Sequence, residues 1–340
     1  MSGTISQANI NRRIKGSHEM KICIYGAGAI GGYLGHGMAA AGYDVSLIAR
    51  GPHMQAIQNN GLALEKDGQV STLQIPCSDD PMDFGPQDFV VVTLKAHSVP
   101  DVAAELTKLF HENTAVVMGV NGLPWWYFYN LGGEFNNRQL ESVDPGGLQW
   151  QYITPARVIG SVVYPACDIQ SPGVIRHIEG DRFSLGEPSG EKTERLRTLA
   201  EIFRKSGFKA PIRPRLRDEI WVKLWGNLSF NPISVLTLAT LEDICGFPET
   251  RALARAMMLE AQEIGKKLGV RFAVDVDKRI DGAASVGAHR TSMLQDLEQG
   301  RAMEVDAVVT AVQELGKLTE VKTPTIDIVL GLLKLRDQQR

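Results

Sequence analysis

The chain of 340 residues has no hydrophobic run that could cross a membrane, because no apolar stretch reaches the ~18 residues that a spanning helix needs. Cysteine is scarce: Cys23, Cys77, Cys167 and Cys245 stand far apart, without a C-x-x-C pair or a metal-ligand spacing. This pattern predicts neither a disulfide framework nor a metal site. It is typical of reduced thiols, so we expect a cytoplasmic protein.

An excess of positive charge is also missing, since 36 lysine and arginine residues face 39 aspartate and glutamate residues. Without a long basic block, we expect no nucleic-acid partner. The first 19 residues are polar and lack the apolar core of a signal peptide. We expect residues 1–19 to form a mobile extension and the folded chain to begin near Met20.

One short stretch, Gly26-Ala27-Gly28-Ala29-Ile30-Gly31, organises the first half of the chain. A buried-strand pattern precedes it, and a small-residue helix pattern and a second strand pattern at 45–49 follow it. In this context G-x-G-x-x-G predicts a dinucleotide site: Gly26 permits a tight turn, Gly28 lets a pyrophosphate approach, and Gly31 lets helix and strand pack closely. The alternative is a glycine-rich turn without a ligand.

The end of the second predicted strand indicates which dinucleotide fits. An NAD site usually carries Asp or Glu about 20 residues past the glycine motif, where it holds the ribose 2′-hydroxyl. Here the position is Arg50. A guanidinium can bind a 2′-phosphate through two hydrogen bonds, so the sequence predicts NADP(H) as the cofactor. The alternative is a solvated surface arginine.

Two further predicted strands, at 88–94 and 114–122, carry the polar residues Lys95 and Asn121 at their C-terminal ends. Ligands of open α/β sheets bind beyond the carboxyl ends of the strands. We therefore expect Lys95 and Asn121 at the nicotinamide end of the cofactor, although each alone is also typical of a loop.

The other local patterns of the first half predict two hairpins, two helices and one strand. Turn residues between alternating runs indicate the hairpins, and apolar spacing indicates the helices. The expected ranges are 61–77 for a hairpin around Asp67-Gly68, 173–186 for one around Glu179-Gly180-Asp181, 98–112 and 191–206 for helices, and 158–163 for a strand.

The segment 124–157 is irregular and aromatic, with Trp125 and Trp126 near its start. A long segment without regular structure is often a lid or a binding loop. The alternative is an aromatic mini-core that fixes an insertion to the domain, and the sequence leaves both open.

Strand patterns end near residue 214. We expect an α/β N-terminal Rossmann-type dinucleotide-binding domain over 20–214 and an all-α C-terminal domain over 215–340 that carries substrate and catalytic residues. The expected helices of the second domain are 216–230, 233–244, 249–268, 273–284, 303–318 and 325–335.

Lys223, Asn227 and Asn231 recur every four residues and therefore share one helical stripe. Their neighbours are nearly all apolar, which predicts a buried helix. Buried lysine and asparagine need partners, so we expect the stripe to line a cleft, where lost solvation lowers the pKa of Lys223 toward the range useful for proton transfer. The alternative is a lysine that reaches solvent, with the asparagines capping a bend before Pro232.

Taken in order, these motifs resemble the ketopantoate reductase (2-dehydropantoate 2-reductase) family, from Met20 nearly to the C-terminus. The resemblance implies an NADPH-dependent oxidoreductase that reduces a 2-oxo acid, ketopantoate, to its 2-hydroxy acid in pantothenate biosynthesis. It also implies a C-terminal domain similar to that of 6-phosphogluconate dehydrogenase. It rests on the glycine motif, Thr93-Leu94-Lys95-Ala96, Asn121-Gly122, Lys223-Leu224 with Asn227 and Asn231-Pro232, Ser292-Met293-Leu294-Gln295-Asp296, and Glu304-Val305-Asp306.

The resemblance also implies roles for single residues. Lys223 would be the general acid, Asn227 and Asn231 would orient the substrate, and Ser292 would bind the substrate carboxylate. Glu304 would hold the substrate hydroxyl or contact the cofactor. By themselves, Ser292 and Glu304 are also typical of a helix cap and of a first helical turn.

The chain departs from the family pattern at several positions. Leu241 stands where the family often has Asn, Val309-Thr310 stands where Asn-Gly is frequent, and the aromatic segment is longer than in the simplest members. Two other functions therefore stay open: a reductase of the same fold for a different 2-oxo acid, and a non-catalytic NADPH-sensing protein. The expected partner is a small-molecule 2-oxo acid, and a homodimer is compatible with it.

Overall fold

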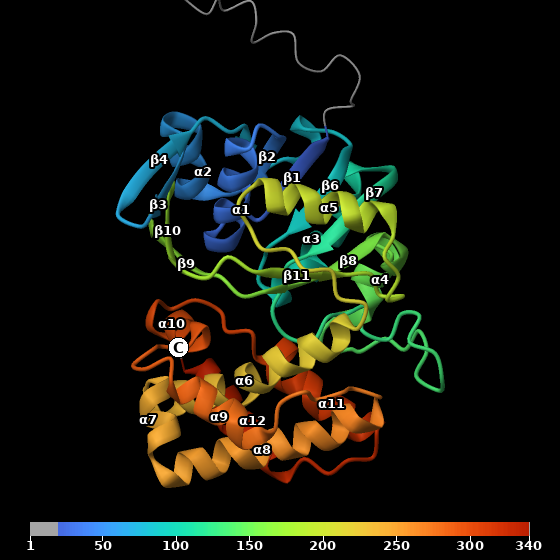
Figure 1. Ribbon diagram of the computed structural model, residues 1–340, viewed down its shortest axis with the longest axis vertical. Coiled ribbons are helices and arrows are strands. Elements are labelled where there is room, and N and C mark those ends of the chain that lie inside the picture. The colour runs from blue at the N-terminus through green and yellow to red at the C-terminus, as the bar shows by residue number, and fades with distance from the viewer. Residues whose placement is uncertain (1–19, 340) are drawn as a thin grey trace, which may run out of the picture.

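The computed structural model describes residues 20–339, so the expected extension at 1–19 lies outside the described residues. The described chain forms two packed parts, of which the first contains all of its strands and the second contains only helices (Figure 1). No helix within residues 20–339 is long and apolar enough to cross a membrane.

Two sheets form the first part. The larger has the strand order β11-β8-β7-β6-β1-β2-β5, and the smaller has the order β4-β3-β10-β9. Neighbours in the larger sheet are parallel except β11, which is antiparallel to β8. The strands are β1 (Lys21–Tyr25), β2 (Asp44–Ile48), β3 (Leu62–Lys66), β4 (Gln69–Leu73), β5 (Cys77–Ser78), β6 (Gln87–Val92), β7 (Phe110–Met118), β8 (Val158–Val163), β9 (Ala166–Ser171), β10 (Val174–Glu179) and β11 (Phe183–Gly186).

Within residues 20–339, five α-helices accompany the sheets, and seven form the second part. The first five are α1 (Ala29–Ala40), α2 (Gly51–Asn60), α3 (Val99–Leu106), α4 (Leu148–Tyr152) and α5 (Glu194–Lys205). The others are α6 (Leu216–Thr237), α7 (Leu241–Gly246), α8 (Pro248–Lys267), α9 (Val276–Ala284), α10 (Ser292–Glu298), α11 (Ala311–Leu318), preceded by a π-helical turn at Asp306–Thr310, and α12 (Pro324–Gln338).

Both faces of the larger sheet are covered. Cys23 and Val90 belong to a core that includes α3 and α6, whereas Ile24 and Val91 belong to a second core with α1 and α5. Alternate side chains of a strand point to opposite faces, so burial on both faces explains the continuous apolar runs at β1 and β6. Because α6 contributes to the first core, the two parts are packed on shared apolar residues.

The hairpin predicted at 61–77 is confirmed by the antiparallel pairing of β3 and β4. The hairpin predicted at 173–186 is wrong. β10 pairs with β9 and β3 in the smaller sheet, while β11 pairs with β8 in the larger one. The turn residues Glu179-Gly180-Asp181 therefore connect the two sheets, because β3 and β9 already pair with both edges of β10 and leave none for β11.

Several predicted helix boundaries differ from the structure. The helix predicted at 98–112 ends at Leu106, and β7 begins already at Phe110. The predicted break before Pro232 is wrong, since α6 continues through Pro232 to Thr237. Proline removes one backbone hydrogen bond, but this stretch of α6 is buried, and tertiary packing holds it helical. The short helix α10 was not predicted. The division of the chain between residues 214 and 215 stays a prediction.

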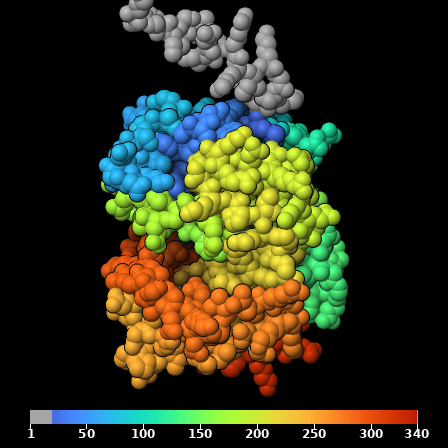
Figure 2. All heavy atoms as spheres, in the orientation of Figure 1, coloured from blue at the N-terminus to red at the C-terminus, as the bar shows by residue number. Residues whose placement is uncertain are grey.

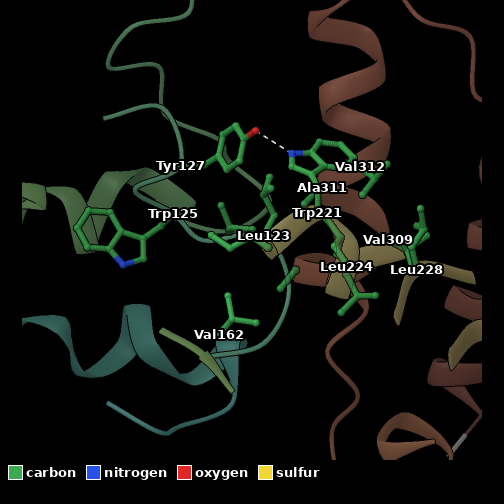
Figure 3. Close-up of a cluster of buried hydrophobic side chains, with 14 of the residues drawn as sticks. Leu123, Trp125, Tyr127, Val162, Trp221, Leu224, Leu228, Val309, Ala311 and Val312 are labelled. Carbon is green, nitrogen blue, oxygen red and sulfur yellow. Dashed lines mark hydrogen bonds between the residues drawn. The ribbon is translucent and has the colours of Figure 1, made fainter. Parts of the chain in front are cut away.

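The aromatic segment 124–157 is largely buried. Trp126, Tyr127 and Phe128 are at most 2% exposed and belong to the core that contains α6. Figure 3 shows Tyr127 pointing at Trp221, whose Nε1 donates a hydrogen bond to the Tyr127 hydroxyl over 2.7 Å. This packing favours the mini-core over a lid.

Candidate active site

A cleft opens where the parallel strands of the larger sheet end, between the two parts of the molecule. Because β1, β2, β6, β7 and β8 are parallel, their carboxyl ends share one edge of the sheet. The residues that follow these ends line the cleft together with residues of α6, α9 and α10, and its volume is about 1030 Å³. Figure 2 shows the surface hollowed between the yellow-green atoms of β9 and β10 and the orange atoms of α10.

The glycine motif forms the turn from β1 to α1 at this cleft. Gly26 has a φ of 102°, which favours glycine, and the N–H groups of Gly26 and Ala27 donate to the Ile48 carbonyl oxygen over 3.0 and 2.8 Å. A Cβ on Gly31 would overlap the Gly26 carbonyl oxygen, whereas one on Gly28 would meet no atom within 4 Å. Gly31 therefore serves helix packing, and Gly28 presents open backbone to the cleft.

Lys223 reaches from α6 to the ends of two strands. Its Nζ donates a hydrogen bond to Oδ1 of Asn121, after β7, over 2.7 Å and another to the carbonyl oxygen of Val163, at the end of β8. Burial lowers the pKa of Lys223 to about 8, and the negative charge of Glu304 offsets part of this effect. The predicted lowering of the pKa is confirmed. An ammonium with such a pKa can release a proton near neutral pH.

Lys95 connects the end of β6 to the helical part. Its Nζ lies 2.6 Å from Oδ2 of Asp296 in α10 and 3.7 Å from Oε2 of Glu304. Glu304 also accepts a hydrogen bond from the Ala96 N–H over 2.9 Å, and Asp296 pairs with Arg301 at 2.9 Å. Both carboxylates are buried. This cluster ties the two parts together beside the cleft and neutralises the Lys95 ammonium.

The remaining predicted substrate residues face the same cleft. Asn227, Asn231 and Ser292 line it. Their side chains form no hydrogen bond with another residue of the described range 20–339, so their polar groups are available to a ligand.

Comparison with known proteins decides the family. Residues 22–134 match the family described as "Ketopantoate reductase PanE/ApbA", and residues 215–337 match "Ketopantoate reductase PanE/ApbA C terminal". A relative named 2-dehydropantoate 2-reductase, from Mesorhizobium japonicum, is 58% identical over 316 residues, which cover 93% of this chain and 97% of the relative. The chain belongs to the ketopantoate reductase family.

Solved structures agree with this membership of the ketopantoate reductase family. A protein of Ralstonia solanacearum MolK2, provisionally assigned as a ketopantoate reductase, is 41% identical and superposes with a TM-score of 0.90 over 94% of this chain and 98% of that one. The 2-dehydropantoate 2-reductase of Geobacter metallireducens GS-15 is 26% identical, with a TM-score of 0.80 over 93% and 99% of the two chains. The predicted Rossmann-type domain followed by a helical domain is confirmed.

The residues that line the cleft of this ketopantoate reductase family member fit a bound dinucleotide. The open backbone at Gly28 and the N-terminus of α1 leave a cradle that a side chain would fill, and the exposed Arg50 follows β2. Of the residues predicted to contact the cofactor, only Gly31 stays away from the cleft, because it packs α1 against β1. The others line it: Gly26, Ala27, Gly28, Ala29, Ile30, Arg50, Lys95, Asn121 and Glu304.

Sequence reasoning missed three side chains that shape the site. His53 holds the glycine loop, since its Nε2 lies 2.8 Å from the Ala27 carbonyl oxygen and its Nδ1 accepts from the Gly173 N–H over 3.0 Å. This arrangement requires a neutral ring with the proton on Nε2, and burial lowers the pKa of His53. Asp296 pairs with Lys95, and Arg279 lines the cleft from α9. Only Asp296 had a signal, as the last residue of the Ser292–Asp296 motif.

A small cavity of about 40 Å³ lies behind Lys223 and Asn121. Trp125, Trp126 and Ser161 line it, and Nε1 of both tryptophans and Oγ of Ser161 are buried without a hydrogen-bond partner in residues 20–339. The aromatic mini-core therefore also forms a wall behind the Lys223 ammonium.

Proposed function

We propose that this protein catalyses the NADPH-dependent reduction of 2-dehydropantoate (ketopantoate) to pantoate, with Lys223 as the general acid. The observation that carries the proposal is the Lys223 ammonium, held by Asn121 and Val163 in the same cleft as the glycine loop. Membership of the family and the 58% identical relative named 2-dehydropantoate 2-reductase support it.

NADPH, when bound, supplies the hydride that reduces the carbonyl carbon. The proton that completes the alcohol comes from the Lys223 Nζ, so that ketone, hydride and proton give the 2-hydroxy acid. Before the transfer, the positive charge of Lys223 stabilises negative charge that develops on the carbonyl oxygen. Asn121 and the Val163 carbonyl keep the ammonium in place, and burial keeps its pKa near the working pH.

The other cleft residues bind and orient. We assign Asn227 and Asn231 to substrate orientation and Ser292 to the substrate carboxylate, because these residues line the cleft and their side chains have no hydrogen-bond partner among residues 20–339. Arg50 would grip the 2′-phosphate that distinguishes NADP from NAD. Lys95 pairs with Asp296 of α10, and Glu304 accepts from the Ala96 N–H, so both residues hold the end of β6 against the helical part. We assign the nicotinamide to this end of the cleft.

A reductase for a different 2-oxo acid is the second candidate. Leu241 lines the cleft where the family often has Asn, so a substrate would meet an apolar group there in place of an amide. The NADPH-sensing alternative is less well supported, since the lysine with its lowered pKa serves proton transfer and a sensor has no need of it.

NADPH oxidation against a panel of 2-oxo acids, with ketopantoate included, tests the proposal. We expect the highest kcat/KM with ketopantoate. A clear preference for another 2-oxo acid would transfer the function to the second candidate, and tight NADPH binding without oxidation of any substrate would favour the sensor.

We also propose a cytoplasmic homodimer. The four cysteines are all free, which suits a reducing compartment. On α12, Ile328, Leu332 and Leu335 are 67%, 52% and 54% exposed and lie on adjacent turns. Sedimentation equilibrium of the protein and of Leu332→Glu tests this, because a dimer that uses this face should dissociate in the variant, and a monomeric parent would refute it.

A further inference from the structure

Arg279 in α9 occupies a distinct place in the cleft. It is half-buried and lines the same cleft as Lys223 and Asn227 of α6. Its guanidinium lies directly against Gly226, because a Cβ built on that glycine would overlap Nη2 of Arg279. Gly226 is three residues from Lys223, so the guanidinium lies beside the helical face that carries the proposed acid.

Arg279 forms no hydrogen bond and no ion pair with any residue of the described range 20–339. Nearby carboxylates are already engaged: Asp277 and Asp281 of α9 pair with Arg255 and Arg251 of α8 at 3.0 and 2.7 Å. The Tyr164 hydroxyl and the Cys245 thiol act electrostatically on the guanidinium, but burial raises the pKa of both, so neither supplies a negative charge near neutral pH.

Two other arginines of the cleft behave differently. Arg182 lies 3.8 Å from Glu219 and stacks on the Tyr164 ring, and Arg301 pairs with Asp296. A half-buried guanidinium without a counter-charge is costly to keep. The position of Arg279 beside Lys223 is explained if a bound ligand supplies a negative charge to the guanidinium.

The glycine opposite Arg279 supports this reading. Glycine inside a helix destabilises it relative to alanine, and Gly226 lies in the middle of α6. Any larger residue at this position would push the guanidinium away from the stripe of Lys223 and Asn227. The helix thus carries an unfavourable residue at a position where Arg279 lies against it.

We propose that Arg279 binds a carboxylate of the oxo-acid substrate, an inference that rests on the reductase function proposed above. A guanidinium presents two parallel N–H groups that match the two oxygens of a carboxylate. Cofactor phosphates are the other anions at hand, but these belong at the glycine loop and Arg50, on the strand side of the cleft. Arg279 stands on the helical side, against α6.

Calorimetric titration of the NADP⁺-loaded protein tests the inference without turnover. The probes are ketopantoate and its neutral analogue, ketopantoyl lactone, which keeps the ketone but lacks the carboxylate. Hydrogen bonds to charged groups correspond to about 10- to 100-fold in affinity. We therefore expect Arg279→Leu to weaken ketopantoate binding by about this factor, to leave lactone binding within a few-fold, and to leave the NADP⁺ affinity unchanged.

Arg255→Leu is the matched control. It also removes one guanidinium, which pairs with Asp277 of α9, but Arg255 is exposed and does not line the cleft. Its binding of ketopantoate should equal that of the parent. If Arg279→Leu weakened both probes equally, or neither, the inference would be overturned. A weakened NADP⁺ affinity with unchanged ketopantoate binding would reassign Arg279 to a cofactor phosphate.

A second comparison identifies which carboxylate is bound. If Arg279 holds the carboxylate next to the ketone, Arg279→Leu should weaken 2-oxopentanoate and 2-oxoglutarate equally. Ketopantoate has only this one carboxylate, so the first outcome is the expected one. A parent that prefers 2-oxoglutarate and a variant that loses this preference while it binds ketopantoate normally would overturn the inference. Binding of 2-oxo acids without their reduction would refute the proposed function while leaving this inference intact, and a protein that binds no 2-oxo acid would refute both.

Gly226→Ala provides an independent variant, since it should displace Arg279 without changing its charge. We expect it to weaken ketopantoate binding in the parent but to add little in the Arg279→Leu background, because the two changes act on one contact. Fully additive losses would mean that Gly226 acts by another route, and would argue against a carboxylate held at this contact.

Discussion

The Nζ of Lys223 donates a hydrogen bond over 2.7 Å to Oδ1 of Asn121, which joins a helix of the second part to the loop after a strand of the first. The two residues are 102 positions apart in the chain. Their contact places a cation with a lowered pKa at the edge of the sheet where the glycine loop opens. The chemistry of the site therefore depends on how the two parts pack.

The first prediction concerns Lys223 as the acid. Lys223→Ala should lower kcat by about 10²-fold or more, since general acid catalysis by one positioned group is worth about 10²–10⁴-fold. Lys223→Arg should rescue poorly, because a guanidinium stays protonated and has a different shape. Steady-state kinetics and a fluorescence titration of NADPH measure the two effects. A folded Lys223→Ala protein that binds NADPH and turns over within a few-fold of the parent would exclude Lys223 as the acid.

The pH profile follows from the pKa of about 8 for Lys223. Only the protonated lysine can act as an acid, so kcat/KM for ketone reduction should be level below this pH and fall as pH rises through it. The negative charge of Glu304 raises the pKa, so Glu304→Gln should move the falling limb to lower pH. A fall in kcat/KM that occurs at the same pH in Glu304→Gln as in the parent would contradict this assignment. So would a kcat/KM that rises with pH in the parent.

Cofactor choice gives the third prediction. NADPH should bind more tightly than NADH, and Arg50→Asp should reverse or remove the preference, because a carboxylate repels the 2′-phosphate and accepts from a free 2′-hydroxyl. Arg204→Asp, on the exposed surface of α5, makes the same charge change away from the cleft and should keep the preference. Equal affinities of the parent for both dinucleotides would refute the role of Arg50.

The aromatic segment gives the fourth. Trp126 is 2% exposed and packs against Gly160 of β8, so Trp126→Ala should lower the free energy of unfolding by about 3–5 kcal/mol. Phe247→Ala, at a position 58% exposed, should change it by only about 0.5 kcal/mol or less. Denaturant unfolding measures both variants. A Trp126→Ala protein of normal stability whose KM for the substrate rises strongly would restore the lid interpretation.

Local spacing in the sequence determined the glycine turn, the polar stripe of α6 and the residues at the strand ends. The glycine motif between two strand patterns predicted the dinucleotide turn, because that turn needs small residues at three fixed positions within six. The four-residue spacing of Lys223, Asn227 and Asn231 predicted one polar stripe, since helical geometry brings such residues onto one face. Lys95 and Asn121 were predicted at one edge because parallel strands end together. Each inference needs only neighbouring residues and the geometry of one element.

Tertiary structure decided what depends on distant partners. Lys95 meets Asp296 across 201 residues, β10 leaves β11 for β9 and β3, and α6 continues through Pro232 because its surroundings bury it. Arg279 had no local signal at all, since neither its neighbours in α9 nor its charge distinguishes it from a surface arginine. Only the tertiary structure brings its guanidinium against Gly226 and into the cleft, without a counter-ion among residues 20–339. Packing between distant segments depends on shape and burial that no short stretch of sequence encodes.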